Sequence, residues 1–365
     1  MNEHSQKPEL APLLKIEQLS FAYHLPNGKQ IAALRHLNLQ VPRGAIMGLI
    51  GESGCGKTTL CNLLTLSLGY QYGQIYLQGQ EIRSLVGQKE ANKSSLWSQL
   101  FGRKKLQTAT AAHAVGAASA AGATSAALTA DPQLLRSYYS RVQYVFQDPK
   151  SAMPPHLPVK TFACAPLINL KHYSREQALE AVNEMLLQVG LSVDCLQRYP
   201  HELSIGQLQR INLVKSLIIE PELLLCDEIT SALDEESAER CLALLRQYQS
   251  HGGTVLFITH DLGLAPKICS HFALMFKGSI LEQWQGTEKP LHPYAQQLQQ
   301  AQDILAQKAE LSSWQDPMVL SCPVSIDLLC PFLLRCSQAH EPCLQQAPTW
   351  HQLNAQHKIC CHLKA

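Results

Sequence analysis

The chain has 365 residues, of which 46% are hydrophobic and 16% are charged, and 30 Lys and Arg against 29 Asp and Glu leave a formal net charge of +1. This composition supplies a large apolar core, and it excludes a disordered chain or a nucleic-acid binder that relies on bulk positive charge. The length predicts about two domains, and no stretch has the pattern of a secretory signal or a membrane span.

Short apolar runs separated by turns open the chain. They predict strands at residues 14–23, 31–41 and 45–50. The third run leads directly into the glycine-rich turn GESGCGKTT and then into an apolar helix at residues 58–68. A further short strand is predicted at residues 74–77. The chain therefore begins as a β-rich segment that ends in a strand–turn–helix unit.

The composition changes after this β-rich segment. Between residues 107 and 130, twelve of the 24 residues are Ala, and none is Lys, Arg, Asp or Glu. Such a stretch has no amphipathic stripe that could be buried against a core. We interpret residues 86–133 as a surface insertion, and a tolerated insertion is favoured over a functional one.

Strands and helices alternate through the second half of the chain. The predicted elements are a strand in RVQYVFQDP, helices at 175–189, 206–218 and 235–249, strands at 223–226 and 254–259, and a hairpin at 272–281. Because the central strands are apolar throughout, we predict an α/β fold with a parallel sheet covered by helices on both faces. Beyond about residue 290 the chain becomes Gln-rich and then Cys-rich, which predicts a separate C-terminal appendage.

The glycine-rich turn is the strongest chemical signal. Backbone N–H groups of such a turn, placed before a helix, can surround phosphate oxygens. The Lys57 ammonium can reach the terminal phosphates, and the Thr58 hydroxyl suits Mg²⁺. The predicted nucleotide-binding residues are Gly51, Glu52, Ser53, Gly54, Cys55, Gly56, Lys57, Thr58 and Thr59. The sequence therefore predicts that the chain binds a nucleoside triphosphate with Mg²⁺.

Two carboxylates follow the buried strand LLLC. Asp227 and Glu228 would lie at the carboxyl edge of a parallel sheet, where the phosphate site is expected. Asp227 could organise Mg²⁺, and Glu228 could polarise the water that attacks the nucleotide. Taken alone, a strand that ends in two solvated acids needs no function, but the nearby glycine turn favours the catalytic interpretation.

The segment LSIGQ at residues 203–207 completes a set of motifs that resembles the ATP-binding-cassette (ABC) ATPases. Their order along the chain is Tyr23, the glycine turn, Gln147 in FQDP, LSIGQ, Asp227 and Glu228, Asp234 in SALD, and His260 in FITHDL. The resemblance covers about residues 14–285. It implies a P-loop NTPase cassette with a mostly parallel core sheet, an antiparallel N-terminal β subdomain and a helical subdomain.

The resemblance also implies roles within one nucleotide site. Tyr23 would stack on adenine, with Phe21 as a rival. Gln147 would join Thr58 and Asp227 around Mg²⁺. Glu228 would act as the catalytic base, and His260 would contact the γ-phosphate.

Other motif residues are expected to act across a dimer. Ser204, Gly206 and Gln207 would contact ATP held by the partner's glycine turn, and Asp234 would lie in a loop at the dimer interface. The family normally has Gly where Ile205 stands, and we expect its branched side chain to stiffen and crowd that turn. Ile also replaces the usual Pro at position 229, which is a milder change.

The C-terminal residues narrow the resemblance to the oligopeptide, dipeptide and nickel importer ATPases. The residues HPYAQQL after position 291 and the segment CPFLLRC resemble that subfamily, as do GESGCGK and QDPKSAMPP, although Met153 stands where Asn is usual. Six of the 13 cysteines fall in the last 44 residues. Cys330, Cys336, Cys343 and Cys361 could hold a [4Fe–4S] cluster or Zn²⁺, with Cys322 and Cys360 as substitutes. Four reduced structural thiols remain the alternative.

We therefore predict an ABC ATP-binding domain at residues 12–285 and a transporter-type extension at residues 290–365. The predicted function is the ATP-hydrolysing subunit of a peptide importer. Its expected partners are two integral-membrane permease subunits, a second ABC ATPase in a heterodimer and, indirectly, a solute-binding protein, with no nucleic acid. Its expected place is the cytoplasmic face of the bacterial inner membrane. The alternatives are a nickel or other small-solute importer and a soluble, non-transport ABC ATPase.

Overall fold

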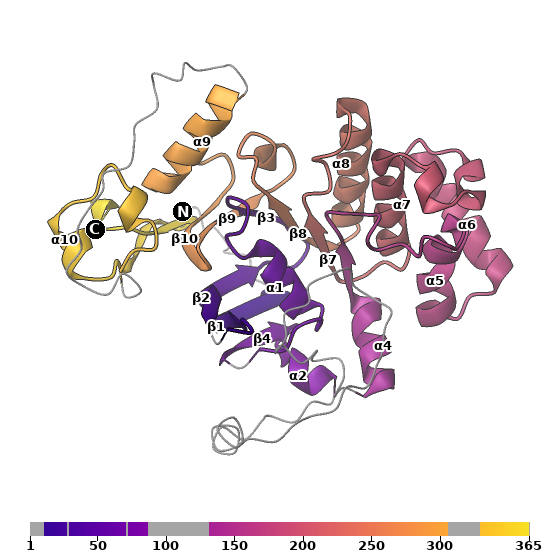
Figure 1. Cartoon of the computed structure of the whole chain (residues 1–365), viewed down its shortest axis with the longest axis horizontal. Helices are drawn as coiled ribbons and strands as arrows, with labels where there is room; N and C mark the ends of the chain where they lie inside the picture. Colours follow the sequence, from indigo (N-terminus) through magenta and orange to yellow (C-terminus); the bar gives the residue numbers. More distant parts are fainter. Residues whose placement is uncertain (1–10, 28, 71, 87–130, 306–328, 365) are drawn as a thin grey trace, which may run out of the picture.

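The computed structural model describes residues 11–27, 29–70, 72–86, 131–305 and 329–364, and it contains two β-sheets with helices around them (Figure 1). Most of the Ala-rich segment predicted as an insertion, and also Cys322, lie outside the described residues. The last residues of that predicted insertion are ordered helix. Asp131 caps helix α4 (Pro132–Arg141) by accepting hydrogen bonds from the backbone N–H groups of Gln133 and Leu134.

The first sheet is antiparallel, as the β-rich start of the chain predicts. It contains β1 (Leu14–His24), β2 (Gln30–Val41), β4 (Tyr72–Leu77) and β5 (Gln80–Glu81), in the order β2-β1-β4-β5. A short helix, α2 (Ile82–Leu85), follows β5. The leucine and isoleucine side chains that alternate along β1 and β2 are buried on one face, and this face packs on the core described next.

Within the described residues, the second sheet has eight strands in the order β11-β12-β10-β9-β3-β8-β7-β6. Five of these strands are parallel to one another: β3 (Ile46–Ile50), β6 (Val142–Val145) at one edge, β7 (Leu223–Asp227), β8 (Thr254–Thr259) and β9 (His271–Phe276). All residues of β3, β7 and β8 are buried, as the continuous apolar runs predict for a sheet covered on both faces. The predicted α/β fold is confirmed.

Each face of the parallel sheet has its own hydrophobic core. Helix α1 (Lys57–Leu64) contributes Leu60 and Leu63 to the core that joins the parallel sheet to the antiparallel sheet. The opposite face is covered by α7 (Ile205–Leu217) and α8 (Glu235–Ser250), with α5 (Val159–Lys171) and α6 (Arg175–Gln188) beyond them. In the described part of the chain, no helix is both long enough and apolar enough to cross a membrane.

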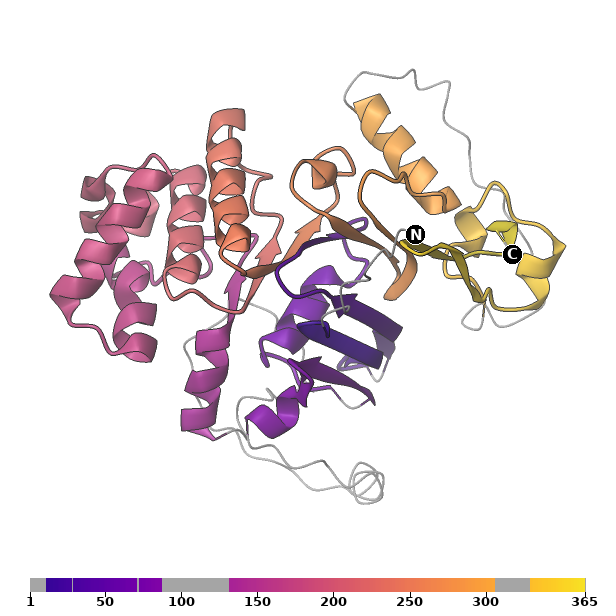
Figure 2. The same cartoon turned by 180° about the vertical axis from the view of Figure 1, so that it is seen from behind.

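The C-terminal residues extend the parallel sheet. Strand β12 (His357–Cys360) pairs with β10 (Ser279–Gln285) in antiparallel orientation, and β11 (Trp350–Asn354) pairs with β12. The sequence predicts a separate appendage here, but the backbone groups along the outer edge of β10 find their partners in β12. Figures 1 and 2 show this end of the molecule opposite α5 and α6.

Two helices complete the C-terminal part, α9 (Pro293–Leu305) and α10 (Glu341–Gln345). The 3-10 helices of the described residues are Val193–Gln197, Pro200–Glu202, Ala265–Lys267, Leu333–Arg335 and His362–Lys364. The boundary predicted near residue 290 stays a prediction, since the sheet continues across it.

Candidate functional site

The glycine turn connects β3 to α1 and can be built only with glycine at two positions. A Cβ on Gly51 would overlap the backbone oxygen of Met275. Gly56 has a φ of 111°, and a Cβ there would lie 2.5 Å from the Ala33 oxygen. Because L side chains avoid this φ and the neighbouring backbone leaves no room, these glycines fix the shape of the loop.

Lys57 lies folded into the loop that precedes it. Its side chain is buried, and Nζ donates hydrogen bonds to the backbone oxygens of Gly51 (2.6 Å) and Glu52 (2.9 Å). The loop therefore holds an ammonium group next to the N-terminus of α1, and both features favour an anion. This is the arrangement that the sequence predicts for binding phosphate groups.

Asp227 ends β7 and is almost fully buried, with 1% of its surface exposed. Its Oδ2 accepts hydrogen bonds from the Thr58 hydroxyl and the Tyr144 hydroxyl, each at 2.9 Å. Burial raises the pKa of Asp227, and these two hydrogen bonds oppose the shift. The predicted pair of Thr58 and Asp227 therefore lies together, and its hydroxyl and carboxylate oxygens are suitable ligands for Mg²⁺.

The sequence prediction missed Tyr144. Its ring is buried in β6, and only its hydroxyl reaches the Asp227 carboxylate. A tyrosine in a short strand that leads into the Gln147 loop is a weak signal, because most such tyrosines belong to the core. The hydroxyl is what distinguishes Tyr144 from a phenylalanine of the core, because a buried hydroxyl needs a hydrogen-bond partner.

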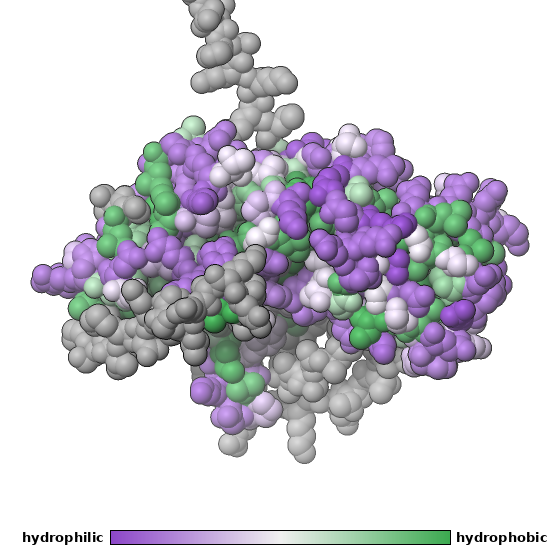
Figure 3. Space-filling view, turned by 90° about the horizontal axis from the view of Figure 1, so that it is seen from above, coloured by the Kyte–Doolittle hydropathy of each residue, from purple (hydrophilic) through white to green (hydrophobic). Residues whose placement is uncertain are grey.

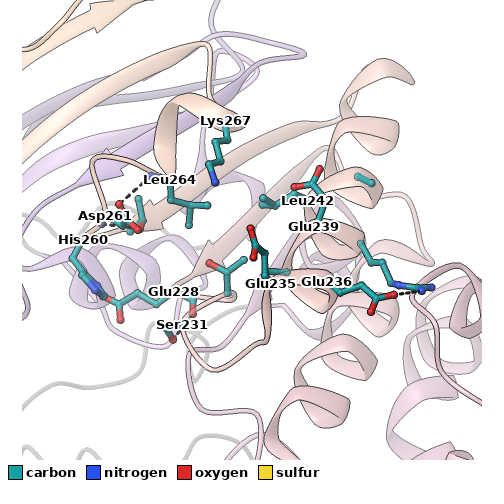
Figure 4. A pocket seen from close by; sticks show the side chains of 15 residues that line it. Glu228, Ser231, Glu235, Glu236, Glu239, Leu242, His260, Asp261, Leu264 and Lys267 are labelled. Carbon is teal, nitrogen blue, oxygen red and sulfur yellow. Dashed lines mark hydrogen bonds and ion pairs between the residues drawn. The ribbon is translucent and has the colours of Figure 1, made fainter. Parts of the chain in front are cut away.

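Glu228 follows Asp227 and lies between two side chains that the sequence predicts for the same site. Its Oε2 accepts a hydrogen bond from Gln147 Nε2 at 2.7 Å, and its Oε1 lies 3.1 Å from His260 Nδ1. Figure 4 shows the His260 ring beside the Glu228 carboxylate. Glu228 has a φ of 48°, a conformation that costs a non-glycine residue about 1–3 kcal/mol. The fold therefore imposes a strained backbone where three chain segments converge on one carboxylate.

A cavity of about 1040 Å³ opens beside this carboxylate. Glu228 and His260 line it together with residues of α8 and of the segment after β8, including Glu235, Glu239 and Lys267 (Figure 4). The lining residues do not include the glycine turn. The cavity therefore gives solvent access to the Glu228 carboxylate.

Tyr23 and Phe21 lie side by side near the glycine turn. The Tyr23 hydroxyl is 3.1 Å from the Thr59 hydroxyl, and the two rings meet edge to face with centroids 5.0 Å apart. Both rings are partly exposed. The choice between them as the adenine-stacking residue stays open.

The residues of LSIGQ form the start of α7. The Ser204 hydroxyl accepts a hydrogen bond from the Gln207 backbone N–H, and the Gln207 side chain accepts one from the Ser204 N–H, which forms a capping box. Ile205 is the first residue of α7, and 46% of its surface is exposed. Because its φ is not in the left-handed region, the backbone in this conformation does not need glycine, and the expected stiffening of the turn stays a prediction. Crowding of an outside ligand by its exposed side chain stays a prediction.

Asp234 caps α8. Its Oδ1 accepts a hydrogen bond from the Ser237 backbone N–H at 2.9 Å, and this bond lowers the pKa of Asp234. The predicted position of Asp234 at a dimer interface is not tested by one chain. Its capping role accounts for the residue within the chain itself.

The four predicted cysteine ligands line one small cavity in the C-terminal part. Cys330, Cys336, Cys343 and Cys361 surround it together with His292, whereas Cys360 is not among the lining residues and its thiol faces the Pro348 oxygen. Burial raises the pKa of the Cys330 thiol to about 12. Within the described residues, no three His, Cys, Asp or Glu side chains are close enough to hold a single metal ion.

The comparison with known proteins is decisive for the family. The sequence profile of the ABC transporter family matches residues 34–231, which cover the glycine turn, LSIGQ, Asp227 and Glu228. The chain belongs to the ABC transporter family.

Three relatives that match more than nine-tenths of this chain are named oligopeptide transport ATP-binding proteins. The chain is 28% identical to the oligopeptide transport ATP-binding protein OppF of Haemophilus influenzae, with 96% of both chains covered. It is 29% identical to OppF of Escherichia coli, with 96% of this chain and 95% of the relative covered. AppF of Bacillus subtilis, also an oligopeptide transport ATP-binding protein, is 27% identical, with 91% and 90% covered.

Solved structures confirm the ABC cassette fold. A dimeric post-hydrolysis structure of the ATP-binding cassette MJ0796 with ADP and Pi matches with a TM-score of 0.56 and 21% identity, and covers 74% of this chain and 98% of that one. Subunit cbiO1 of the cbiONQ complex from Clostridium perfringens matches with a TM-score of 0.53 and 21% identity, over 81% and 94% of the two chains. The roles of individual residues are not tested by these matches.

Proposed function

We propose that this ABC protein is the ATP-hydrolysing subunit of a bacterial peptide importer. The observation that carries the proposal is the convergence of Gln147 and His260 on the Glu228 carboxylate, next to the Asp227–Thr58 pair. The names of the relatives, which include oligopeptide transport ATP-binding proteins in three bacteria, support peptides as the transported solute.

The roles of the residues follow from their positions. Backbone N–H groups of the glycine turn and the Lys57 ammonium bind the phosphates of ATP, while Lys57 exchanges its loop carbonyls for phosphate oxygens. Thr58, Asp227 and Gln147 would hold Mg²⁺, which supplies charge neutralisation on the phosphates. Glu228 accepts the proton of the attacking water, and Gln147 and His260 orient its two oxygens.

The signature residues act on a second nucleotide. Ser204, Gly206 and Gln207 lie at the start of α7, where backbone N–H groups and the Ser204 hydroxyl can donate to a phosphate presented by a facing cassette. A dimer is therefore required, and Asp234 lies in the loop that meets the partner. Because the exposed Ile205 side chain stands on this surface, we expect a different ABC ATPase as the partner, which makes the two composite sites unequal.

The Gln147 loop and the helical region at about residues 150–200 are the proposed contact to two membrane permease subunits. Five large hydrophobic residues of this region are exposed, at residues 157, 173, 187, 193 and 199. Figure 3 shows hydrophobic side chains among polar ones at this end of the molecule. The proposed location is the cytoplasmic face of the inner membrane, where a solute-binding protein acts only through the permeases.

The cysteine-lined cavity is proposed to hold a [4Fe–4S] cluster. A tetrahedral zinc site with bonds of about 2.3 Å needs its thiolates close together, and no group of described side chains meets that condition. A cluster is larger than one ion and is held by four separated thiolates. His292 Nε2 is buried without a hydrogen-bond partner and belongs to the same cavity lining, so it is available to a ligand there. Iron and acid-labile sulfide in anaerobically purified protein would support the cluster, and absence of both would remove it.

The test of the main proposal is the variant Glu228→Gln, with Glu17→Gln as the matched control. Glu17 lies on β1 and is partly exposed to solvent. We expect Glu228→Gln to bind ATP like the unchanged chain but to hydrolyse it about 100-fold or more slowly, since the catalytic base is gone. Unchanged hydrolysis would contradict the assigned role.

The same variant tests transport. With ATP and Mg²⁺ present, the tagged Glu228→Gln chain should co-purify from detergent-solubilised membranes with two multi-span permeases and a second ABC ATPase. Uptake assays on cells lacking the chain then compare labelled peptides with nickel. If cells lacking the chain lost only nickel uptake, nickel would replace peptides as the proposed solute. If the tagged chain purified without any membrane protein, the proposed role in transport would be contradicted.

A further inference from the structure

Glu52, the second residue of the glycine turn, is held by two residues from the C-terminal part of the chain. Its carboxylate accepts two hydrogen bonds from Arg335 Nη1, at 2.9 Å to Oε1 and 2.8 Å to Oε2. Its backbone N–H donates to the Tyr294 hydroxyl at 2.8 Å. The side chain and the backbone of one loop residue are therefore both fixed from outside the loop.

Arg335 is itself held in place by its neighbours. Its guanidinium lies 5.2 Å from the centroid of the Phe276 ring and 5.8 Å from that of Phe332, and Nη2 donates to Gln297 Oε1 at 3.1 Å. A guanidinium fixed by ring contacts and a second hydrogen bond loses little additional freedom when it binds a carboxylate. The ion pair with Glu52 is therefore ordered by packing, although both side chains remain about one-third exposed.

Tyr294 forms the buried side of the same contact. It is 1% exposed, and its ring packs against Phe276 and Phe332 with centroids 4.7 Å and 5.3 Å away. Because Phe276 ends β9, Tyr294 connects the loop to the parallel sheet as well as to the C-terminal part. Its hydroxyl occupies a fixed position, and the Glu52 N–H donates to it.

Glu52 also touches the lysine that is expected to bind phosphate. The Glu52 backbone oxygen accepts a hydrogen bond from Lys57 Nζ. A displacement of Glu52 would therefore shift Lys57 in the loop. In addition, the Glu52 carboxylate places a negative charge on a loop that binds a polyanion, and the paired Arg335 neutralises it.

We propose that Arg335 and Tyr294 are positioning residues for the glycine turn, and that the C-terminal part of the chain thereby sets the affinity for ATP. The inference rests on the proposed ATP binding. Neither residue touches the Glu228 carboxylate or its two partners, so the maximal rate of hydrolysis does not depend on them.

The experiment measures Mg²⁺-ATP binding and hydrolysis by the full chain carrying Arg335→Ala, Tyr294→Phe or the control Lys15→Ala. Lys15 forms an ion pair with Glu17 on β1, with both side chains about 40% exposed. We expect Arg335→Ala to raise the dissociation constant and the KM for ATP about threefold to tenfold while kcat changes less than about twofold. Tyr294→Phe should act in the same direction, and Lys15→Ala should change neither constant.

A second comparison separates positioning from a general loss of structure. If Arg335 neutralises Glu52, then Glu52→Gln in the Arg335→Ala background should recover part of the lost affinity, because no unpaired carboxylate remains. Equal ATP affinity for Arg335→Ala, Tyr294→Phe and the unchanged chain would overturn the inference. A fall in kcat with unchanged KM would also overturn it. If the unchanged chain itself fails to bind ATP, the proposed function fails instead.

Discussion

A buried histidine clamps the C-terminal hairpin to the parallel sheet, and replacing it should release the hairpin. His357 is 3% exposed, and its two ring nitrogens each lie 2.6 Å from a carboxylate oxygen, Nε2 from Glu282 and Nδ1 from Glu288. Both ring nitrogens of this buried side chain therefore have a carboxyl group as partner. Glu282 is fully buried, and its carboxylate also accepts hydrogen bonds from the backbone N–H groups of Leu291 and His292.

The variant His357→Ala leaves the buried Glu282 side chain without its histidine partner. Removal of one partner from a buried hydrogen bond costs about 1–3 kcal/mol, which is a measurable share of the 5–15 kcal/mol that is typical for a folded protein. Because His357 lies on β12, we expect this loss to fall on the β11–β12 hairpin before it reaches the central strands. His357→Gln keeps one hydrogen-bond donor and most of the side-chain volume, so it should lower the free energy of unfolding by less than His357→Ala.

Urea unfolding and limited proteolysis test this prediction against the control His251→Ala, an exposed histidine at the end of α8. His357→Ala should lower the free energy of unfolding by about 1–3 kcal/mol and speed cleavage within residues 350–360. Its KM for ATP should also rise if the hairpin helps to hold Arg335. A change within about 0.5 kcal/mol of the control, as for ordinary surface substitutions, would refute the stabilising role of the buried His357 contacts.

Two further predictions concern Glu228, the proposed catalytic base, and Lys215, a partly buried lysine of α7. Gln147→Ala removes the 2.7 Å hydrogen bond to Glu228. Because loss of this bond costs about 1.4 kcal/mol, kcat at saturating ATP should fall about tenfold. An unchanged kcat would show that His260 alone orients Glu228. Burial lowers the pKa of Lys215 to about 8, so folding disfavours its charge, and the chain should gain stability as pH rises from about 8 toward the unfolded value near 10.5. In urea unfolding at pH 7, Lys215→Met should therefore be about 2 kcal/mol more stable than the unchanged chain, and this difference should disappear near pH 10. The same difference in stability at pH 7 and at pH 10 would contradict the lowered pKa of Lys215.

The motifs predict the centre of the site well because each combines a short sequence pattern with the end of a strand. The glycine turn, Asp227 and Glu228 follow β3 and β7, and parallel strands bring such ends to one edge of the sheet. Gln147 and His260 follow β6 and β8 at the same edge. Their contacts with Glu228 are thus a consequence of topology, which the alternation of strands and helices already indicates.

The contacts that the sequence did not predict join distant segments through single side chains. Tyr144 reaches Asp227 across 83 residues, and Arg335 reaches Glu52 across 283. The pattern around each residue is that of an ordinary core tyrosine or surface arginine, and only the packing of the surrounding elements brings it to its partner. The sequence also did not predict the pairing of β12 with β10, since a four-residue strand has little periodicity of its own.

The pairing of β12 with β10 also decides how this protein can be shortened. A chain that stopped after β10 would keep every nucleotide-binding motif, but β10 would become an edge strand with a row of unpaired N–H and C=O groups. Trp284, now 4% exposed and stacked on Phe272, would lose the cover of His357. Exposed edges of this kind template pairing between molecules, so a truncated cassette would tend to aggregate. The β11–β12 hairpin thus moves the edge of the sheet from β10, which carries buried side chains, to the mostly exposed strand β11.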